Sequence, residues 1–513
     1  MNRLLSPKSK SVGNDANLSL PATDGVVSTR AKHITTAVAM AAAVGGGVVS
    51  TRAKHITTQR SGGPVYQSPL DPSAERPRER ESQSVRQGFS WLALGNIVNA
   101  ACAWGRVALL ARLGSAAMVG QLTLALAICN PIRTLADLGL AGSLIFDAKR
   151  QYRVGDYLVL RLLTSGLSML VIILTAWTSG YDPATARLVM LAGLVVTSES
   201  VCELFQAVLQ RREQMRWVAI SLAIRGMLGL TFFALGTWLS GDLAWGVCGF
   251  TLAALTTLLL IDIPRALMSE SLEKPVPKHD VPCFGGMRHQ FSVLLGLAWL
   301  SLPLGLATAS LSLMTSLPRY WISNRMGNEA LGGFAVAGSL MVAMSLVVGA
   351  MSQAASPRLA RYYAAGNTQA LLRLLRDLGL WLTASMIISL VVMAIAGHWI
   401  IGLLFGPAYV PYAGVALCLM LAGGLGNFSV FLGRVIASMR RFRTNLLLRV
   451  VGIVVLVLLL PGWIDWLGLM GAAWALTLSW LFTVLLSLAA VLRAVRQCPL
   501  QAVSISAKDE AVC

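Results

Sequence analysis

Long apolar runs dominate this chain from Gly88 to Arg493 and constrain its fold more than any other feature. Each run holds about 18 or more mostly apolar residues, enough to cross the hydrocarbon core of a bilayer as a helix. Inside a bilayer every backbone polar group needs an internal partner, which helices supply within one segment. With 56% hydrophobic and 13% charged residues, the composition agrees with this pattern. The sequence therefore predicts an all-α, polytopic membrane protein.

Twelve such runs are long enough to be transmembrane helices. Short polar loops separate them, and their hydropathy sets each boundary to within about four residues. The expected spans are 89–110, 118–145, 158–179, 186–209, 217–239, 243–263, 292–321, 331–355, 377–400, 412–438, 445–462 and 466–492.

Basic residues alternate between the two sets of loops that these spans define. One set carries only Arg112, Arg187 and Arg325, whereas the other is rich in lysine and arginine. By the positive-inside rule the richer set is cytoplasmic, with both termini, which predicts a bacterial inner-membrane protein. Topology and lipid headgroups account for the net charge of +19, so nucleic acid is not an expected partner. The richer set comprises Lys149, Arg150, Arg153, Arg211, Arg212, Arg216, Arg265, Lys274, Lys278, Arg288, Arg358, Arg361, Arg373, Arg376, Arg440, Arg441 and Arg443.

One stretch of the chain occurs twice. The segment Ala111–Ile128 is repeated in weaker form as Asn324–Met341, and both copies begin with a polar turn that falls outside the membrane. Turns on the same side predict two six-helix bundles related by a parallel pseudo-two-fold repeat, with the working site between them. We expect the bundles at 88–263 and 291–493, joined by a cytoplasmic linker at 264–290.

The two ends of the chain are polar. Residues 1–87 carry too little apolar surface to fold alone, and we expect a disordered cytoplasmic tail. Within this tail the twelve-residue segment GVVSTRAKHITT occurs at Gly25–Thr36 and again at Gly47–Thr58, as a tandem duplication would leave it. Residues 494–513 are expected to form a cytoplasmic C-terminal tail.

Several classes of function lack their motifs here. The chain has no Gly-Lys dipeptide, so it has no Walker A loop, and it has no HExxH, GxSxG or DxD motif. Its eight cysteines show no CxxC pairing, and most lie in apolar runs. We therefore expect neither disulfides, nor a metal, nor a cofactor, and no enzymatic activity.

Eight ionisable residues fall in or near the spans, where each costs about 2.5–3.5 kcal/mol unless it faces a partner or a cavity. Arg225 is the deepest, eight residues or about 12 Å into the fifth span, and we expect it to line a cavity. Arg106 and Arg434 lie nearer the interfaces and could either snorkel or bind substrate. The full set is Arg106, Arg133, Asp137, Glu199, Glu203, Arg225, Arg319 and Arg434.

The acidic members of this set allow more than one interpretation. Arg133 and Asp137 are four residues apart, as expected for a local ion pair. Glu199 and Glu203 share one helix face and could either pair with Arg225 or carry a coupled proton or cation.

Other polar residues and two prolines also lie at membrane depth. Asn96, Asn99 and Gln206 indicate either a hydrated inner face of the first bundle or hydrogen bonds between helices. Pro131 and Pro303 each remove a backbone hydrogen bond, so we expect the second and seventh spans to kink there.

Five segments together carry a resemblance to a known family. The first repeated stretch is followed by LADLGL, and the second half contains PRYWISNRMGNEALGGFAVA, SPRLARYYAAGN and LLFGPAYVPYA, in this order. This pattern resembles the polysaccharide-biosynthesis lipid flippases of the multidrug/oligosaccharidyl-lipid/polysaccharide exporter (MOP) superfamily. The resemblance covers about Gly88–Arg493. We also consider kinship with the flippases of xanthan-type exopolysaccharide clusters.

The resemblance implies a V-shaped pair of bundles around a cationic cavity, which moves an undecaprenyl-diphosphate-linked oligosaccharide to the periplasmic leaflet. It also implies partners in the polymerase and export machinery. The role of cavity arginine is carried over first to Arg225, and then to Arg106, Arg434 and Arg319. The alternatives are a cation-coupled drug or metabolite antiporter of the same superfamily and a membrane-embedded glycosyl or acyl transferase.

Overall fold

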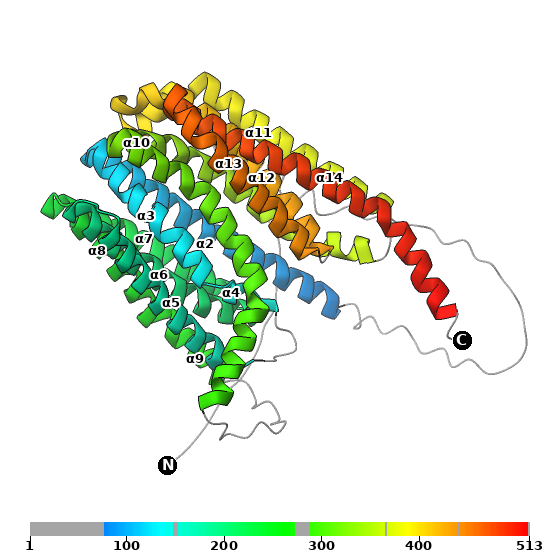
Figure 1. Ribbon diagram of the computed structural model, residues 1–513. Helices are drawn as coiled ribbons and strands as arrows, with labels where there is room; N and C mark the ends of the chain where they lie inside the picture. The colour runs from blue at the N-terminus through cyan, green and yellow to red at the C-terminus, as the bar shows by residue number, and fades with distance from the viewer. Residues whose placement is uncertain (1–75, 147–151, 272–286, 365–366, 440, 511–513) are drawn as a thin grey trace, which may run out of the picture. The chain divides into compact units, whose positions relative to one another are not determined.

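The computed structural model describes residues 76–146, 152–271, 287–364, 367–439 and 441–510, and the regular structure in these ranges is entirely helical. The long helices run side by side, as an all-α membrane protein requires (Figure 1). The α-helices are α2 (Arg76–Leu113), α3 (Ala116–Ala136), α4 (Leu140–Phe146), α5 (Val154–Thr178), α6 (Pro183–Arg211), α7 (Met215–Ser240), α8 (Leu243–Thr257), α9 (Ile263–Ser271), α10 (Met287–Ala364), α11 (Thr368–Phe405), α12 (Ala413–Ser438), α13 (Phe442–Leu467) and α14 (Leu469–Glu510). A π-helical turn, Leu258–Asp262, joins α8 to α9, and a 3-10 turn, Pro407–Tyr412, precedes α12.

Eleven helical segments of the described chain are long and apolar enough to cross a membrane. They coincide with the predicted spans except at Phe291–Val342, a 52-residue segment that covers the seventh span and the start of the eighth. Within α10 the backbone leaves helical geometry at Gly327, where φ is 84° and ψ is 177°. This break lies in the loop predicted between the two spans, so the two counts differ only here and the count of twelve stays a prediction.

Several helices extend past the predicted membrane boundaries. α2 begins at Arg76, α9 continues to Ser271 and α14 continues to Glu510, inside the segments predicted as tails and linker. Hydropathy locates only the apolar part of a helix, whereas Arg, Glu and Gln favour helix on either side of it. The rest of the predicted tail, with its duplicated segment, and residues 272–286 of the linker lie outside the described residues.

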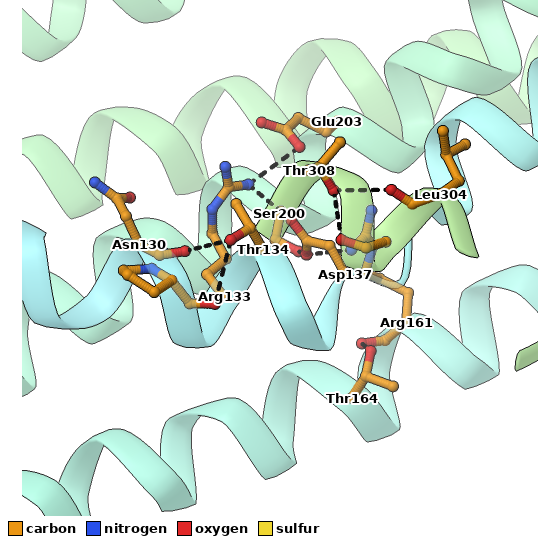
Figure 2. A network of polar contacts seen from close by, with 12 residues as sticks. Asn130, Arg133, Thr134, Asp137, Arg161, Thr164, Ser200, Glu203, Leu304 and Thr308 are labelled. Carbon is orange, nitrogen blue, oxygen red and sulfur yellow. Dashed lines mark hydrogen bonds and ion pairs between the residues drawn. The ribbon is translucent and has the colours of Figure 1, made fainter. Parts of the chain in front are cut away.

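The second predicted span is interrupted close to one end. α3 ends at Ala136, and the next residues include Leu138 with φ of 50° and Gly139 with φ of 68°, after which α4 begins. Pro131 lies inside α3 and Pro303 inside α10, and the bends predicted at them stay predictions. The interruption makes Asp137 the C-cap residue of α3, so its carboxylate lies at a helix end that faces α5 and α6 (Figure 2).

The two copies of the repeated segment pack directly against each other. A Cβ atom added to Gly120 of α3 would lie 1.7 Å from the carbonyl oxygen of Asn328 in α10. In the same way, a Cβ atom added to Gly332 of α10 would lie 1.9 Å from the carbonyl oxygen of Ala116. Small residues let membrane helices approach to backbone contact, and dispersion then holds them together without a hydrophobic driving force.

Polar side chains of α2 bridge to the same region. Arg112 donates from Nε to the carbonyl of Leu404 at 3.0 Å, and also bonds to the carbonyl of Leu403. The indole Nε1 of Trp104 donates to Ser339 Oγ at 3.1 Å. Helices of the first half are therefore tied to α10 and α11 by hydrogen bonds as well as by backbone contact.

The close approach of α3 and α10 predicts a sharp difference between two glycine substitutions. Gly120→Ala should lower the midpoint of thermal unfolding in detergent, because the new methyl group meets the backbone oxygen of Asn328 and overpacking costs about 1–3 kcal/mol. Gly166→Ala, in α5, is the matched control, since a Cβ atom there meets no atom within 4 Å. Alanine in that open helical position should leave the midpoint unchanged or slightly raised. Equal midpoints for the two variants would contradict this packing.

Candidate functional site

An ion-pair network joins α3, α5 and α6 around Asp137 (Figure 2). Arg133 Nη1 lies 3.1 Å from Asp137 Oδ2 and 3.1 Å from Glu203 Oε2. Arg161 of α5 forms a second ion pair with Asp137, and the hydroxyl of Ser200 donates to the same carboxylate. The local pair expected between Arg133 and Asp137 is thus present. It belongs to a larger network whose other members were not expected from the sequence.

Because this network is buried, its ion pairs also help to hold α3, α5 and α6 together. The side chain of Arg161 is only 1% exposed, and a guanidinium with so little water needs an anionic partner. Asp137 can serve two arginines because its position at the end of α3 leaves both carboxylate oxygens open to neighbouring helices.

A second group of charges lies on α2, α6 and α7, without direct ion pairs. Arg225 is 6% exposed, and no described residue forms a hydrogen bond with its Nε or Nη1. It interacts electrostatically with Glu199, Glu203 and Asp262, but no carboxylate of the described chain lies within the 4.0 Å of an ion pair. The guanidinium of Arg106 lies 4.0 Å from the centre of the Phe250 ring and also interacts with Glu199.

The interior charges of the first half therefore balance in number. Away from the ends of the membrane spans, the described first half carries four arginines and four carboxylates. Each arginine has at least one acidic group within electrostatic range. The two sets are Arg106, Arg133, Arg161 and Arg225 against Asp137, Glu199, Glu203 and Asp262.

The second half differs because one of its arginines is buried beside a second arginine. Arg449 of α13 is 7% exposed, and within the described part of the chain its Nε and Nη1 have no hydrogen-bond partner. It lies close enough to Arg434 of α12 for the two positive charges to repel each other. Arg319 of α10 is half-buried, and no described carboxylate lies within ion-pair distance of it. The described acidic residues of this half, Glu329, Asp377 and Asp465, are all exposed.

The polar residues expected at membrane depth have different environments. Gln206 is buried and donates from Nε2 to Ser221 Oγ at 3.0 Å, so it makes a hydrogen bond between α6 and α7. Asn99 lies where α2 meets α7, against Gly226. Asn96 is exposed, and its side chain donates to the carbonyl of Leu92 at 2.8 Å. The second interpretation, hydrogen bonding between helices, therefore describes Gln206.

Three buried charged residues were not singled out from the sequence. Arg161, Asp262 and Arg449 each lie within about four residues of a predicted span end, where charges are usually solvated. The sixth span in fact continues to Met268, which places Asp262 inside it. A signal was available for Asp262 alone, since it is an acidic residue directly following a long apolar run.

Comparison with known proteins identifies the family. The model of a family described as "Polysaccharide biosynthesis protein" matches residues 85–363. The chain belongs to this family. This member is 24% identical over 402 residues to the capsular polysaccharide biosynthesis protein CapF of Staphylococcus aureus, covering 77% of the present chain and 96% of CapF. The resemblance seen in the sequence is confirmed.

Solved structures give the fold of this polysaccharide biosynthesis protein. The lipid II flippase MurJ in an inward closed conformation aligns with a TM-score of 0.60 at 12% identity, covering 80% of this chain and 90% of MurJ. A MOP superfamily transporter from Pyrococcus furiosus aligns with a TM-score of 0.59 at 12% identity over 81% and 96% of the two chains. The family member therefore has the fold of the MOP superfamily, as predicted. No cluster of three or more potential metal ligands occurs among its described residues.

The network around Asp137 predicts a large loss of stability on truncation. In Asp137→Ala, Arg161 and Arg133 lose a buried counter-charge, and breaking a buried pair in this way costs about 3–5 kcal/mol. The matched control is Asp465→Ala, which removes an exposed ion pair with Arg325 at 2.8 Å, worth about 0–1 kcal/mol. Thermal unfolding of both variants in nanodiscs is the measurement. Comparable midpoints would show that the buried network contributes little.

Proposed function

We propose that this protein moves an undecaprenyl-diphosphate-linked oligosaccharide from the cytoplasmic to the periplasmic leaflet of the bacterial inner membrane. Both termini are cytoplasmic in this proposal, and the product enters exopolysaccharide or O-antigen assembly. Its family and fold support this role, because relatives with this fold include a lipid II flippase. Partners in the same pathway would be the polymerase and the export machinery.

The physical demand on such a protein is to lower two separate penalties. Each sugar hydroxyl costs a few kcal/mol when it loses water without gaining a new partner. A diphosphate carries negative charge that hydrocarbon excludes. A polar path between the two halves would meet the first demand, and cations in the protein interior would meet the second, while the polyprenyl chain stays in lipid.

The single observation that carries the proposal is the buried positive charge of Arg449 beside Arg434 in the second half. Arg449 is 7% exposed, its Nε and Nη1 have no hydrogen-bond partner among the described residues, and it lies close enough to Arg434 for the two positive charges to repel each other. Two adjacent guanidinium groups form a favourable site for a dianion, since each can bind phosphate oxygens through a planar fork of N–H donors. Arg319 adds a third positive charge to the same half.

The first-half arginines have a different part in this proposal. Arg225 was the first choice from the sequence, and its two open donors support a role in substrate binding together with Arg106. Both lie within range of Glu199, so they would bind a diphosphate against competition from a carboxylate. We therefore propose that Arg434 and Arg449 make the main contribution to phosphate affinity, and that Arg225 contributes conditionally.

The membrane potential is a sufficient bias for this direction of transport. For an inside-negative membrane, outward movement of each negative charge is favourable by about 2.3 kcal/mol per 100 mV. An alternating-access cycle could use this energy without hydrolysing a nucleotide, and the sequence contains no Walker A motif.

Two rival functions remain distinguishable. An antiporter for cationic drugs needs carboxylates that outnumber the arginines at its substrate site, whereas the described first half balances four carboxylates with four arginines and the described second half has only exposed carboxylates. A membrane-embedded transferase would fail to make its lipid-linked product, whereas a flippase mutant accumulates the complete lipid-linked oligosaccharide on the cytoplasmic side. Analysis of the lipid-linked sugars in a strain lacking the protein separates these outcomes and identifies the sugar.

The second-half arginine pair gives the decisive variant. Arg449→Ala should lower polymer yield at least tenfold and leave the lipid-linked oligosaccharide on the cytoplasmic side, because a phosphate-binding cation is lost. Arg225→Ala should act in the same direction. The matched control is Arg325→Ala, which removes an exposed arginine at a helix end. Normal polymer yield from well-expressed Arg449→Ala and Arg225→Ala proteins would refute the assigned roles.

A further inference from the structure

A buried carboxylate without a hydrogen bond lies in the sixth span. Asp262 is the last residue of the π-helical turn Leu258–Asp262, and its side chain is fully buried. Neither Oδ1 nor Oδ2 has a hydrogen-bond partner among the described residues. A π-helical turn inserts one extra residue into a helix and redirects the side chains beside it, and such turns are frequent at functional sites.

The groups that face Asp262 come from two other helices. α6 contributes Cys202 and Gln206, and α7 contributes Ser221 and Arg225. The polar groups of Cys202, Gln206 and Ser221 lie near the carboxylate without forming a hydrogen bond of ordinary geometry to it, and Arg225 acts on it by charge. Ser221 Oγ already accepts from Gln206 Nε2 at 3.0 Å, so its own O–H remains available as a donor. Among the described residues, Arg225 is the charged group that acts on this carboxylate.

The other charged groups of the neighbouring helices have partners elsewhere. Glu203 forms an ion pair with Arg133 at 3.1 Å and is 41% exposed. Glu199 acts on Arg225 and Arg106. Arg265, three residues after Asp262, lies over the ring of Trp217 at 3.5 Å. Among the described carboxylates of the first half, Asp262 is thus both fully buried and without an ion pair.

Two features of this environment act on the protonation of Asp262 in opposite directions. An ionised carboxylate that is buried without hydrogen bonds is strongly disfavoured, so burial favours the neutral acid. Attraction to Arg225 favours the ionised form, although the two groups do not form an ion pair within 4.0 Å. Because burial and the attraction to Arg225 act in opposite directions, small changes around Asp262 can add or remove its proton.

We propose that Asp262 is a proton-binding site whose occupancy decides whether Arg225 is available to an anionic substrate. A proton added to one carboxylate oxygen gives a neutral acid, and Arg225 is then free to bind phosphate. Release of that proton restores a carboxylate that competes with the phosphate for the same guanidinium. The inference rests on the proposed function, in which Arg225 contributes to binding the diphosphate.

The chemistry of the site favours a proton over a metal ion. Arg225 repels a metal cation, and the other neighbours are a thiol, an amide and a hydroxyl, which add no negative charge to offset that repulsion. Protonation removes the unpaired charge without bringing in a second ion, and it needs no coordination sphere.

The first test measures the proton directly. Infrared difference spectra of the full-length protein in nanodiscs, recorded between acid and alkaline pH, should contain a band from a protonated carboxylic acid. Asp262→Asn, which keeps the side-chain size, should remove that band, and Asp262→Ser is a second variant in case the amide impairs folding. Glu203→Gln is the control and should leave the band in place. A band that survives in both Asp262 variants overturns the site.

The second test measures the link to Arg225, with inorganic pyrophosphate as the probe. Wild-type protein should bind pyrophosphate about tenfold more tightly at acid pH than at alkaline pH. A tenfold change corresponds to a difference of about one unit in the pKa of the linked group between the free and the bound protein. Asp262→Asn should bind at the tight, acid-like level at every pH, because its side chain stays neutral. An unchanged pH dependence in this variant overturns the link. The polymer assay of Arg449→Ala reports separately on the proposed function, so the two failures can be told apart.

Discussion

The cost of placing charge in hydrocarbon governs the arrangement of this protein. In the first half that cost is offset internally, since Asp137 serves Arg133 and Arg161, and Glu203 serves Arg133 as well. In the second half it is not offset by any described carboxylate in the interior. One half therefore balances its interior charges, and the other places Arg449 and Arg434 near each other. Such a division favours recognition of an anion on one side of the protein, with the other side holding the helices in position.

Close packing and polar bridging complement this electrostatic division. Gly120 and Gly332 bring α3 and α10 to backbone contact, and Trp104 and Arg112 add hydrogen bonds from α2. These contacts involve both copies of the repeated segment, so the repeat is a packing element and not only a trace of duplication. The glycine contacts leave no room for added atoms. The hydrogen bonds of Trp104 and Arg112 can instead be replaced by hydrogen bonds to water.

The sequence predicted the helical membrane class, the family and most span positions, because hydropathy and length carry that information directly. It also predicted the Arg133–Asp137 pair, which depends only on spacing along one helix. It did not predict that Glu203 pairs with Arg133, because that choice depends on how α6 is rotated against α3. Arg161, Asp262 and Arg449 were missed for another reason. Hydropathy places charged residues at span ends, and here the helices continue past those ends.

The two copies of the repeat use the same arginine in different ways. Arg112 bonds to carbonyls in the last turn of α11, where a helix has unsatisfied acceptors and the negative end of its dipole. Its counterpart Arg325 forms an exposed ion pair with Asp465. Both arginines are exposed, so salt weakens the charged part of each contact, while the hydrogen bonds of Arg112 to main-chain carbonyls are kept. Corresponding ends of the duplicated segments should therefore respond unequally to ionic strength, an asymmetry that could let one end loosen while the other holds.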